Sequence, residues 1–202
     1  MKKLSKILII DTATKFIYLS LVIDGIEKQC VYQEGINNHS VTIIPNLEDM
    51  LNKENLSLRD LDEIIIGVGP GSYTGVRIGV TVAKMIGYLN HFKVSQVSSL
   101  ALIASASDKE YIIPNIDARR GNAFMALIKQ KNGILEYIKP DCLENIDIFK
   151  AACEHEFDFI SEGMPNVNKI IASGLLEEVK NVHELKPNYL RITEAERNKQ
   201  KW

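Results

Sequence analysis

A chain of 202 residues with 46% hydrophobic content is able to bury a core, and its length suits one large domain or two small lobes. The formal net charge of −2 argues against a protein that binds nucleic acid through a dominant basic face, although lysine and arginine gather near the end of the chain. Three cysteines without paired spacing indicate reduced thiols, and the apolar run Ile7–Ile10 is too short for a signal peptide or a membrane span. We therefore expect a cytoplasmic globular protein.

The first half of the sequence predicts three strands, followed by a helix, a strand, a second helix and a further strand. β-Branched and aromatic residues dominate the strand segments, and Asp24-Gly25 is a strong hairpin signal between the second and the third. Apolar residues at helical spacing mark the helices, the first of which contains Pro45 and should kink there. The expected strands are 6–12, 16–23, 27–33, 63–68 and 94–97, and the expected helices are 38–53 and 74–90.

The second half repeats this order, which indicates an internal duplication. Asp11 ends the first strand of its half fourteen residues before Gly25, and Asp117 ends its strand sixteen residues before Gly133. The expected strands are 111–117, 122–129, 134–139 and 157–161, and the expected helices are 144–154 and 168–180. Units of this size are too long for a solenoid repeat, so we expect two related lobes, 1–100 and a shortened 101–202 with a basic tail.

Duplicated β-β-β-α-β-α lobes define an α/β fold that resembles the actin and hexokinase (ASKHA) fold, in which a nucleotide lies in the cleft between the lobes. Acidic residues at the first hairpins of that fold handle the metal of the nucleotide, so Asp11 and Asp117 are candidates for a facing carboxylate pair. An equally good interpretation is that each carboxylate bonds the amides of its own turn. The candidate cleft residues are Asp11, Thr12, Gly71, Ser72 and Asp117.

The segment Gly69–Gly79 joins the strand at 63–68 to a helix rich in small residues. A helix N-terminus presents unpaired N–H groups that suit anions, yet a P-loop would require lysine where Val76 stands. Beyond the loop, small residues recur every four positions and lie on one helix face, where they permit close approach of a neighbour from the same chain or from another chain. The expected partner interface consists of Gly75, Gly79, Ala83 and Gly87 with Val41, Ile44 and Met50 of the first helix.

Several motifs, standing in order, resemble those of the TsaB (YeaZ) family of the bacterial tRNA threonylcarbamoyladenosine system. They are Ile10–Thr14, Gly69–Gly79, Val97–Leu100, Asp117–Gly121 and Pro187–Arg191. The resemblance implies a non-catalytic scaffold in a heterodimer with TsaD, the paralogue that transfers threonylcarbamoyl to N6 of adenosine 37 in tRNAs reading codons that begin with A. It also implies the ATPase TsaE in the larger assembly, and contact with tRNA that is indirect or weak. Whether the isolated chain forms a homodimer, and whether a nucleotide sits at the junction with TsaD, stays open.

The sequence departs from TsaD-like proteins at their metal site. Those proteins hold a metal with two histidines four residues apart, and this sequence has Ser99 and Ile103 at the corresponding positions. Neither side chain replaces an imidazole, so we expect neither a metal nor another cofactor.

Two other functions compete with the scaffold. A small-molecule kinase of the same fold needs an adenosine loop, for which the second lobe offers only the isolated Gly163 and Gly174. A peptidase needs a histidine beside Ser72, Ser98 or Ser99, and the sequence has no nucleophile-elbow pattern to nominate one. The nucleotide affinity of the isolated chain separates a kinase from a scaffold.

Overall fold

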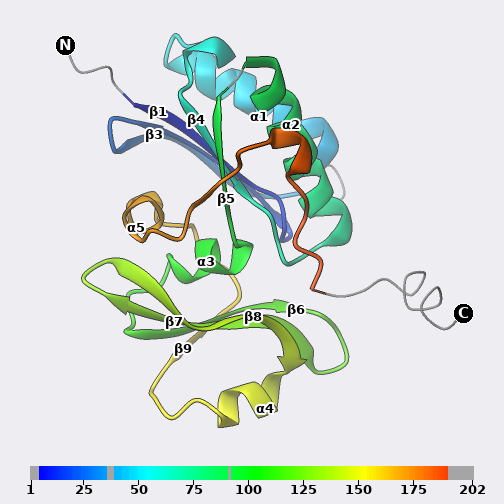
Figure 1. Cartoon of the computed structure of the whole chain (residues 1–202), viewed down its shortest axis with the longest axis vertical. Coiled ribbons are helices and arrows are strands. Elements are labelled where there is room, and N and C mark those ends of the chain that lie inside the picture. Colours follow the sequence, from blue (N-terminus) through cyan, green and yellow to red (C-terminus); the bar gives the residue numbers. More distant parts are fainter. Residues whose placement is uncertain (1–4, 36–38, 91, 191–202) are drawn as a thin grey trace, which may run out of the picture.

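The computed structural model describes residues 5–35, 39–90 and 92–190, and its strands form two sheets that follow one another along the long axis of the molecule (Figure 1). In the described part, the first sheet has the strand order β10-β5-β4-β1-β2-β3 and the second has the order β8-β7-β6-β9. The strands are β1 Lys6–Asp11, β2 Phe16–Ile23, β3 Ile26–Glu34, β4 Glu63–Gly67, β5 Lys93–Val97, β6 Tyr111–Asp117, β7 Asn122–Lys131, β8 Ile134–Asn145, β9 Asp158–Ile160 and β10 Glu177–Glu178.

The helices are α1 His39–Lys53, α2 Tyr73–Asn90, α3 Ser99–Ala104, α4 Ile146–Ala151 and α5 Val167–Ala172, with short 3-10 turns η1 Leu58–Asp60 and η2 Val182–Glu184. α1 continues through Pro45, which lies exposed, so the element predicted there is present although it holds a proline. In the part of the chain that the structure describes, no helix is both long and apolar enough to cross a membrane.

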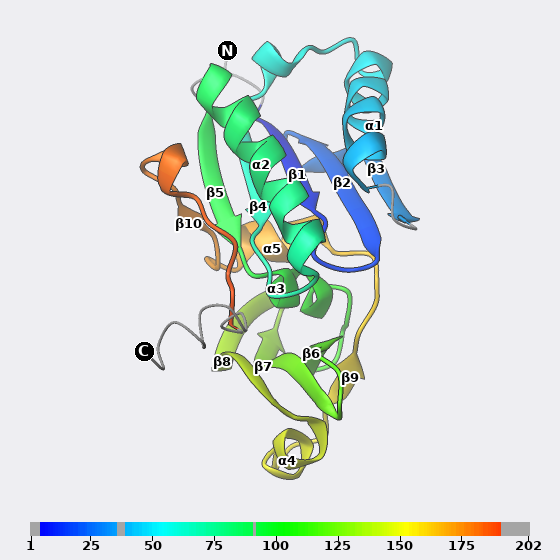
Figure 2. The ribbon, with the colours of Figure 1, turned by 90° about the vertical axis from the view of Figure 1, so that its right-hand side faces the viewer.

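The centre of the first sheet is buried on both faces. β1 and β4 run parallel with Ile9 opposite Ile65, and both side chains are fully buried. α1 and α2 cover one face of the sheet (Figure 2), while α3 and the second sheet cover the other, where Ile9 and Ile65 join the core between the sheets. Strands covered on both faces require the nearly continuous apolar runs that the sequence shows.

The second sheet repeats the topology of the first and confirms the predicted duplication and α/β fold. β6 pairs antiparallel with β7 and parallel with β9, as β1 pairs with β2 and β4. The order β8-β7-β6-β9 therefore corresponds to β3-β2-β1-β4. The repeat differs in its helices, because α4 and α5 have six residues each where α1 and α2 have fifteen and eighteen.

The chain returns to the first sheet after α5, which corrects the predicted last helix. α5 ends at Ala172 rather than at 180, because Gly174 adopts a left-handed φ of 66° that a helix cannot continue. Glu177 and Glu178 of β10 then pair with β5, and η2 packs on α2. The segment 177–190 runs beside the first sheet before it reaches the second (Figure 2).

Candidate functional site

The loop between β4 and α2 is packed against the hairpin that joins β1 and β2. The N–H of Ser72 donates to the carbonyl oxygen of Ala13 at 2.7 Å. A Cβ at Gly71 would lie 2.3 Å from that same carbonyl oxygen, so no larger residue fits. The Ser72 hydroxyl accepts the N–H of Gly75 at 3.2 Å and so caps the first turn of α2. The loop is thus bonded to the hairpin of its own chain and to the first turn of α2.

The row of small residues on α2 faces the first sheet of the same chain, which contradicts the expectation that it forms a partner interface. A Cβ at Gly75 would lie 2.1 Å from the backbone oxygen of Thr12, and one at Gly79 would lie 2.5 Å from its hydroxyl. Ala83 is fully buried, and a Cβ at Gly87 would come within 2.7 Å of a side chain of β5. The close approach that the small residues permit is therefore intramolecular.

Thr12, predicted to line a cleft, instead fastens α2 to the end of β1. Its hydroxyl donates to the carbonyl oxygen of Gly75 at 2.7 Å and accepts the N–H of Gly79 at 3.1 Å. These are the two backbone groups that bond each other in a regular helix. The side chain is 1% exposed, so it is not available to a ligand.

The residues of α1 assigned to the interface are divided between the core and the surface. Met50 is 2% exposed and lies in the main core cluster, which corrects its assignment, and Ile44 is partly buried against the same cluster. Val41 is 68% exposed and is free to meet a partner. The exposed side of α2 carries a different set of residues at four-residue spacing, which we call the outer face of α2: Tyr73, Arg77, Thr81, Met85 and Leu89.

The sequence interpretation missed the outer face of α2 although the same four-residue spacing marks it. The small residues form one row along α2, and the polar and hydrophobic residues of the outer face form another. Both rows repeat every four positions. Which row faces the sheet depends on contacts with Thr12, which is remote in sequence.

Asp11 is a buried carboxyl at the end of β1. One of its oxygens accepts the N–H of Ala13 at 2.9 Å and the hydroxyl of Ser99 at 3.1 Å. Burial raises the pKa of Asp11 to about 6, against the hydrogen bonds from Ala13 and Ser99, which lower it. Gly67 lies so close that a Cβ there would be 2.7 Å from the carboxyl carbon. The carboxyl is thus held by its own turn and by α3.

Asp117 does not face Asp11 as a second carboxylate. It is exposed at the end of β6, and one of its oxygens accepts the N–H of Arg119 at 2.9 Å. Each aspartate therefore bonds the amide two residues further on, as the alternative interpretation of the sequence proposed. The pocket that Asp11 lines includes neither Asp117 nor Thr12, Gly71 or Ser72, so the structure does not bring the predicted cleft residues together.

The pocket beside Asp11 is a small cavity closed by the segment 161–165, which we call the strap. Glu162 of the strap forms an ion pair with Lys15 at 2.5 Å, and the N–H of Gly163 donates to the hydroxyl of Tyr32 at 3.1 Å. The cavity measures about 20 Å³, close to the volume that one ordered water needs. The strap thus closes the interlobe site over Asp11.

The serines considered for a peptidase contact acids and backbone amides instead of histidine. The Ser98 hydroxyl donates to Asp141 at 2.6 Å, and the Ser99 hydroxyl accepts the N–H of Gly69 at 3.0 Å. Of the two histidines whose side chains are described, His155 stacks on Tyr111 and His183 makes a tilted ring contact with Tyr88.

His39 and His91 fall outside the described side chains. Within the described ranges, no three histidine, cysteine, aspartate or glutamate side chains are grouped as a metal site.

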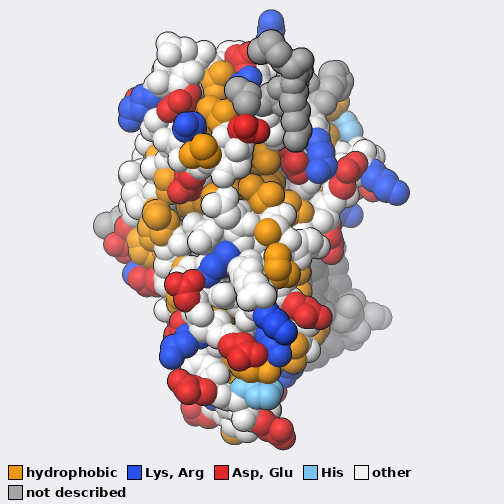
Figure 3. Space-filling view, turned by 90° about the vertical axis from the view of Figure 1, so that its left-hand side faces the viewer, with side chains coloured by type: hydrophobic (Ala, Val, Ile, Leu, Met, Phe, Trp, Pro, Cys, Tyr) orange, Lys and Arg blue, Asp and Glu red, His pale blue; other side chains and the backbone are white. Residues whose placement is uncertain are grey.

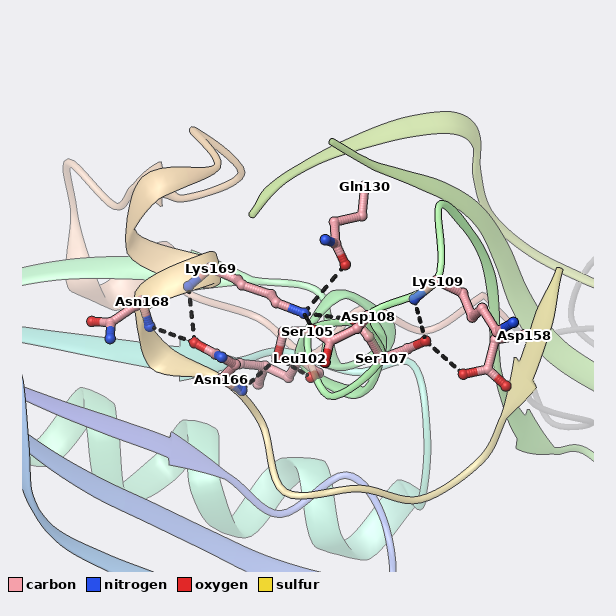
Figure 4. Close-up of polar contacts among 10 residues, drawn as sticks. All are labelled: Leu102, Ser105, Ser107, Asp108, Lys109, Gln130, Asp158, Asn166, Asn168 and Lys169. Carbon is pink, nitrogen blue, oxygen red and sulfur yellow. Dashed lines mark hydrogen bonds and ion pairs between the residues drawn. The ribbon is translucent and has the colours of Figure 1, made fainter. Parts of the chain in front are cut away.

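Lys169 of α5 is a buried cation that joins this helix to the segment before β6 and to β7 (Figure 4). Its ammonium donates to the carbonyl oxygen of Ser107 at 2.6 Å, to Asp108 at 2.7 Å and to Gln130 at 3.2 Å. The lysine is 8% exposed, and all three of its N–H donors therefore have acceptors. Because Asn166 caps the same short helix, this network fixes α5 rather than binding a ligand.

On the side of the molecule opposite the outer face of α2, the charged side chains are not all of one sign. Acidic and basic side chains are interspersed over it, with patches of hydrophobic side chains between them (Figure 3). A mixed surface of this kind does not attract a polyanion strongly.

Known proteins share both the sequence and the architecture of this chain. The family model described as TsaD, tRNA N6-adenosine threonylcarbamoyltransferase, matches residues 22–197. The tRNA threonylcarbamoyladenosine biosynthesis protein TsaB of Bacillus subtilis (strain 168) is 34% identical over 94% of this chain and 96% of its own length. The protein of the same name from Escherichia coli (strain K12) is 32% identical over 64% of this chain and 58% of its own length.

A solved structure, YeaZ from Pseudomonas aeruginosa, matches with a TM-score of 0.77 over 92% of this chain and all of that chain, at 20% identity, which shows a shared fold. The two related sheets and the closed junction between them define a TsaD-like protein of the ASKHA fold class. The chain belongs to the TsaB (YeaZ) family of tRNA threonylcarbamoyladenosine biosynthesis.

Proposed function

We propose that this chain is the non-catalytic scaffold subunit that TsaD requires, in the cytoplasm, to threonylcarbamoylate N6 of adenosine 37 in tRNAs reading codons that begin with A. In this proposal the chain forms a heterodimer with TsaD, the ATPase TsaE joins the larger assembly, and tRNA is contacted weakly or through TsaD. The small-residue row of α2 takes no part in the heterodimer, because it packs against the sheet of its own chain.

The observation that carries the non-catalytic role is the size of the interlobe cavity. The cavity beside Asp11 measures about 20 Å³, whereas pockets for drug-sized ligands occupy roughly 300 Å³ or more. The strap is bonded to Tyr32 beside this cavity, and the hydroxyls of Thr12 and Ser72 are engaged by α2. These features favour a scaffold over a kinase.

The outer face of α2 supports the proposed contact with TsaD. Met85 and Leu89 of this face are large hydrophobic residues that are 49% and 67% exposed. Tyr88, next to Leu89 in the sequence, is 54% exposed, and Val41 of α1 is 68% exposed. Exposed apolar side chains that gather on one helix face are typical of protein interaction sites.

Two measurements with purified protein test the proposal. Calorimetric titration of the isolated chain with Mg-ATP should give no binding at millimolar nucleotide, while sizing of a mixture with TsaD of the same organism should give a heterodimer. Stoichiometric binding of Mg-ATP to the isolated chain would overturn the scaffold role in favour of a kinase. Elution of the two proteins as separate species would contradict the proposed heterodimer.

A further inference from the structure

Arg77 on the outer face of α2 is held in place by two exposed tyrosines that are distant from each other in sequence. Its guanidinium carbon lies 3.8 Å from the centroid of the Tyr73 ring and 5.6 Å from that of Tyr189. Its Nε donates to the Tyr189 hydroxyl at 2.6 Å. The two rings, with centroids 5.4 Å apart, belong to residues that are 47% and 43% exposed. α2 and the returning C-terminal segment together fix one cation at the surface.

Arg77 has no acidic partner in the part of the chain that the structure describes. The ion pairs found there are all made by lysines, and the Nε of Arg77 bonds a neutral phenol. A long side chain loses rotamer freedom when it binds a ligand. The contacts with Tyr73 and Tyr189 restrict Arg77 before a ligand arrives, which lowers the entropic cost of binding.

The outward-facing groups of the cluster are hydrogen-bond donors. The guanidinium of Arg77 bonds the hydroxyl of Tyr189 through Nε and also interacts with the hydroxyl of Tyr73, and its remaining N–H groups can donate to a planar, two-oxygen acceptor. The Tyr189 oxygen accepts from Arg77, so its own O–H is available to donate to the same acceptor. This set matches a carboxylate.

The surroundings favour a carboxylate on a protein over a phosphate of RNA. Met85 and Leu89 continue the same helix face as exposed hydrophobic residues, which suit a partner helix and offer nothing to a phosphate backbone. Tyrosine and arginine are also among the residue types that most often dominate the binding energy of protein interfaces.

We propose that Arg77, Tyr73 and Tyr189 form a receptor for a carboxylate side chain of the protein that docks on the outer face of α2. The inference rests on the proposed function, since it names the chemical group by which that partner is recognised. Tyr189 is a positioning residue: it turns the terminal nitrogens of Arg77 toward the partner. The hydrophobic residues further along α2 supply contact area, and the receptor fixes the register of docking.

The test is a calorimetric titration of the full chain with TsaD of the same organism, at low and at high salt. Arg77→Gln should raise the Kd by about tenfold or more and reduce its dependence on salt, because the charge pair is lost. Arg77→Lys should restore only part of the affinity, since an ammonium lacks the two-pronged geometry. Tyr189→Phe keeps the stacked ring, yet it should raise the Kd by roughly threefold and add nothing further to Arg77→Gln.

Lys131→Gln, which replaces an exposed lysine at the turn between β7 and β8, is the matched control and should leave the Kd unchanged. If Arg77→Gln binds TsaD as tightly as the wild-type chain at both salt concentrations, the proposed carboxylate receptor is refuted and the proposed function stands. If the wild-type chain does not bind TsaD, both the proposed function and the receptor are refuted. If Arg77→Gln loses affinity for tRNA while keeping its affinity for TsaD, the cluster is a nucleic-acid site and the proposal is overturned.

Discussion

The hydroxyl of Thr12 donates a hydrogen bond of 2.7 Å to the carbonyl oxygen of Gly75, a residue 63 positions away in the sequence. The same hydroxyl accepts the N–H of Gly79, so it sits between two successive turns of α2. Two motifs that the sequence shows far apart, one after β1 and one opening α2, are therefore a single packing unit. Its glycines serve this contact and not an external partner.

Gly79→Ala should destabilise the fold, since a Cβ there would lie 2.5 Å from the Thr12 hydroxyl and 3.3 Å from Ile66. Overpacking of this kind costs roughly 1–3 kcal/mol, which lowers the Tm of a chain this long by roughly 3–10 °C. Thermal unfolding followed by circular dichroism measures the effect, with Thr81→Ala on the exposed side of the same helix as control. A variant that melts like the wild type but no longer binds TsaD would place the small-residue row at the interface after all.

The ionisation of Asp11 should make stability fall as the pH rises. Its pKa in the folded chain is about 6, above the roughly 3.9 of an unfolded aspartate, so the folded state holds the proton more tightly between these values. Ionisation above pH 6 therefore costs of the order of 3 kcal/mol, a cost absent below about pH 4. The substitution Asp11→Asn removes this ionisation and keeps a side-chain oxygen that accepts from Ala13 and Ser99.

Urea unfolding of wild type and Asp11→Asn at about pH 4.5 and about pH 7.5 provides the comparison. The variant should exceed the wild type in unfolding free energy by roughly 2 kcal/mol more at the higher pH than in acid. The opposite result would be a wild type that is more stable at about pH 7.5 than at about pH 4.5, with the gain abolished by Asp11→Asn. It would mean that a cation stabilises the Asp11 carboxylate.

Lys169→Met should weaken the attachment of α5 to the second sheet. The substitution leaves the carbonyl oxygen of Ser107 buried without its donor, which costs about 1–3 kcal/mol. The ion pair itself matters less, since the Asp108 side chain is 93% exposed. In thermal unfolding, Asp108→Asn should accordingly keep the wild-type Tm, and an equal loss in both variants would show that the charge pair, not the buried carbonyl, holds α5.

Much of the fold could be predicted from the sequence, because buried strands and hairpin turns are local signals. The expected strand 16–23 is observed as β2 with the same bounds, and the expected helix 74–90 begins one residue earlier as α2. The last helix could not be placed in this way, since the left-handed Gly174 and the pairing of β10 with β5 end it early. The pairing joins residues some eighty positions apart, and no local pattern encodes it.

The candidate site was harder to predict than the fold. Four-residue spacing shows that Gly79 and Ala83 share a helix face, but it does not show whether that face meets the sheet or a partner. Asp11 and Asp117 occupy equivalent positions in the duplication, yet one is buried and the other exposed, because the second repeat is packed less completely. Sequence symmetry therefore placed both aspartates correctly on their strands and wrongly in one cleft.

The scaffold role is tested most directly by measuring threonylcarbamoylation of an unmodified tRNA by reconstituted TsaD, TsaE and this chain. The chain should be required for modification, and Met85→Glu should abolish both the heterodimer and the modification, because a buried charge would replace a hydrophobic contact on the outer face of α2. Met85 is 49% exposed, so this variant should keep the wild-type Tm. Full modification without the chain, or by a Met85→Glu variant that no longer binds TsaD, would contradict the account.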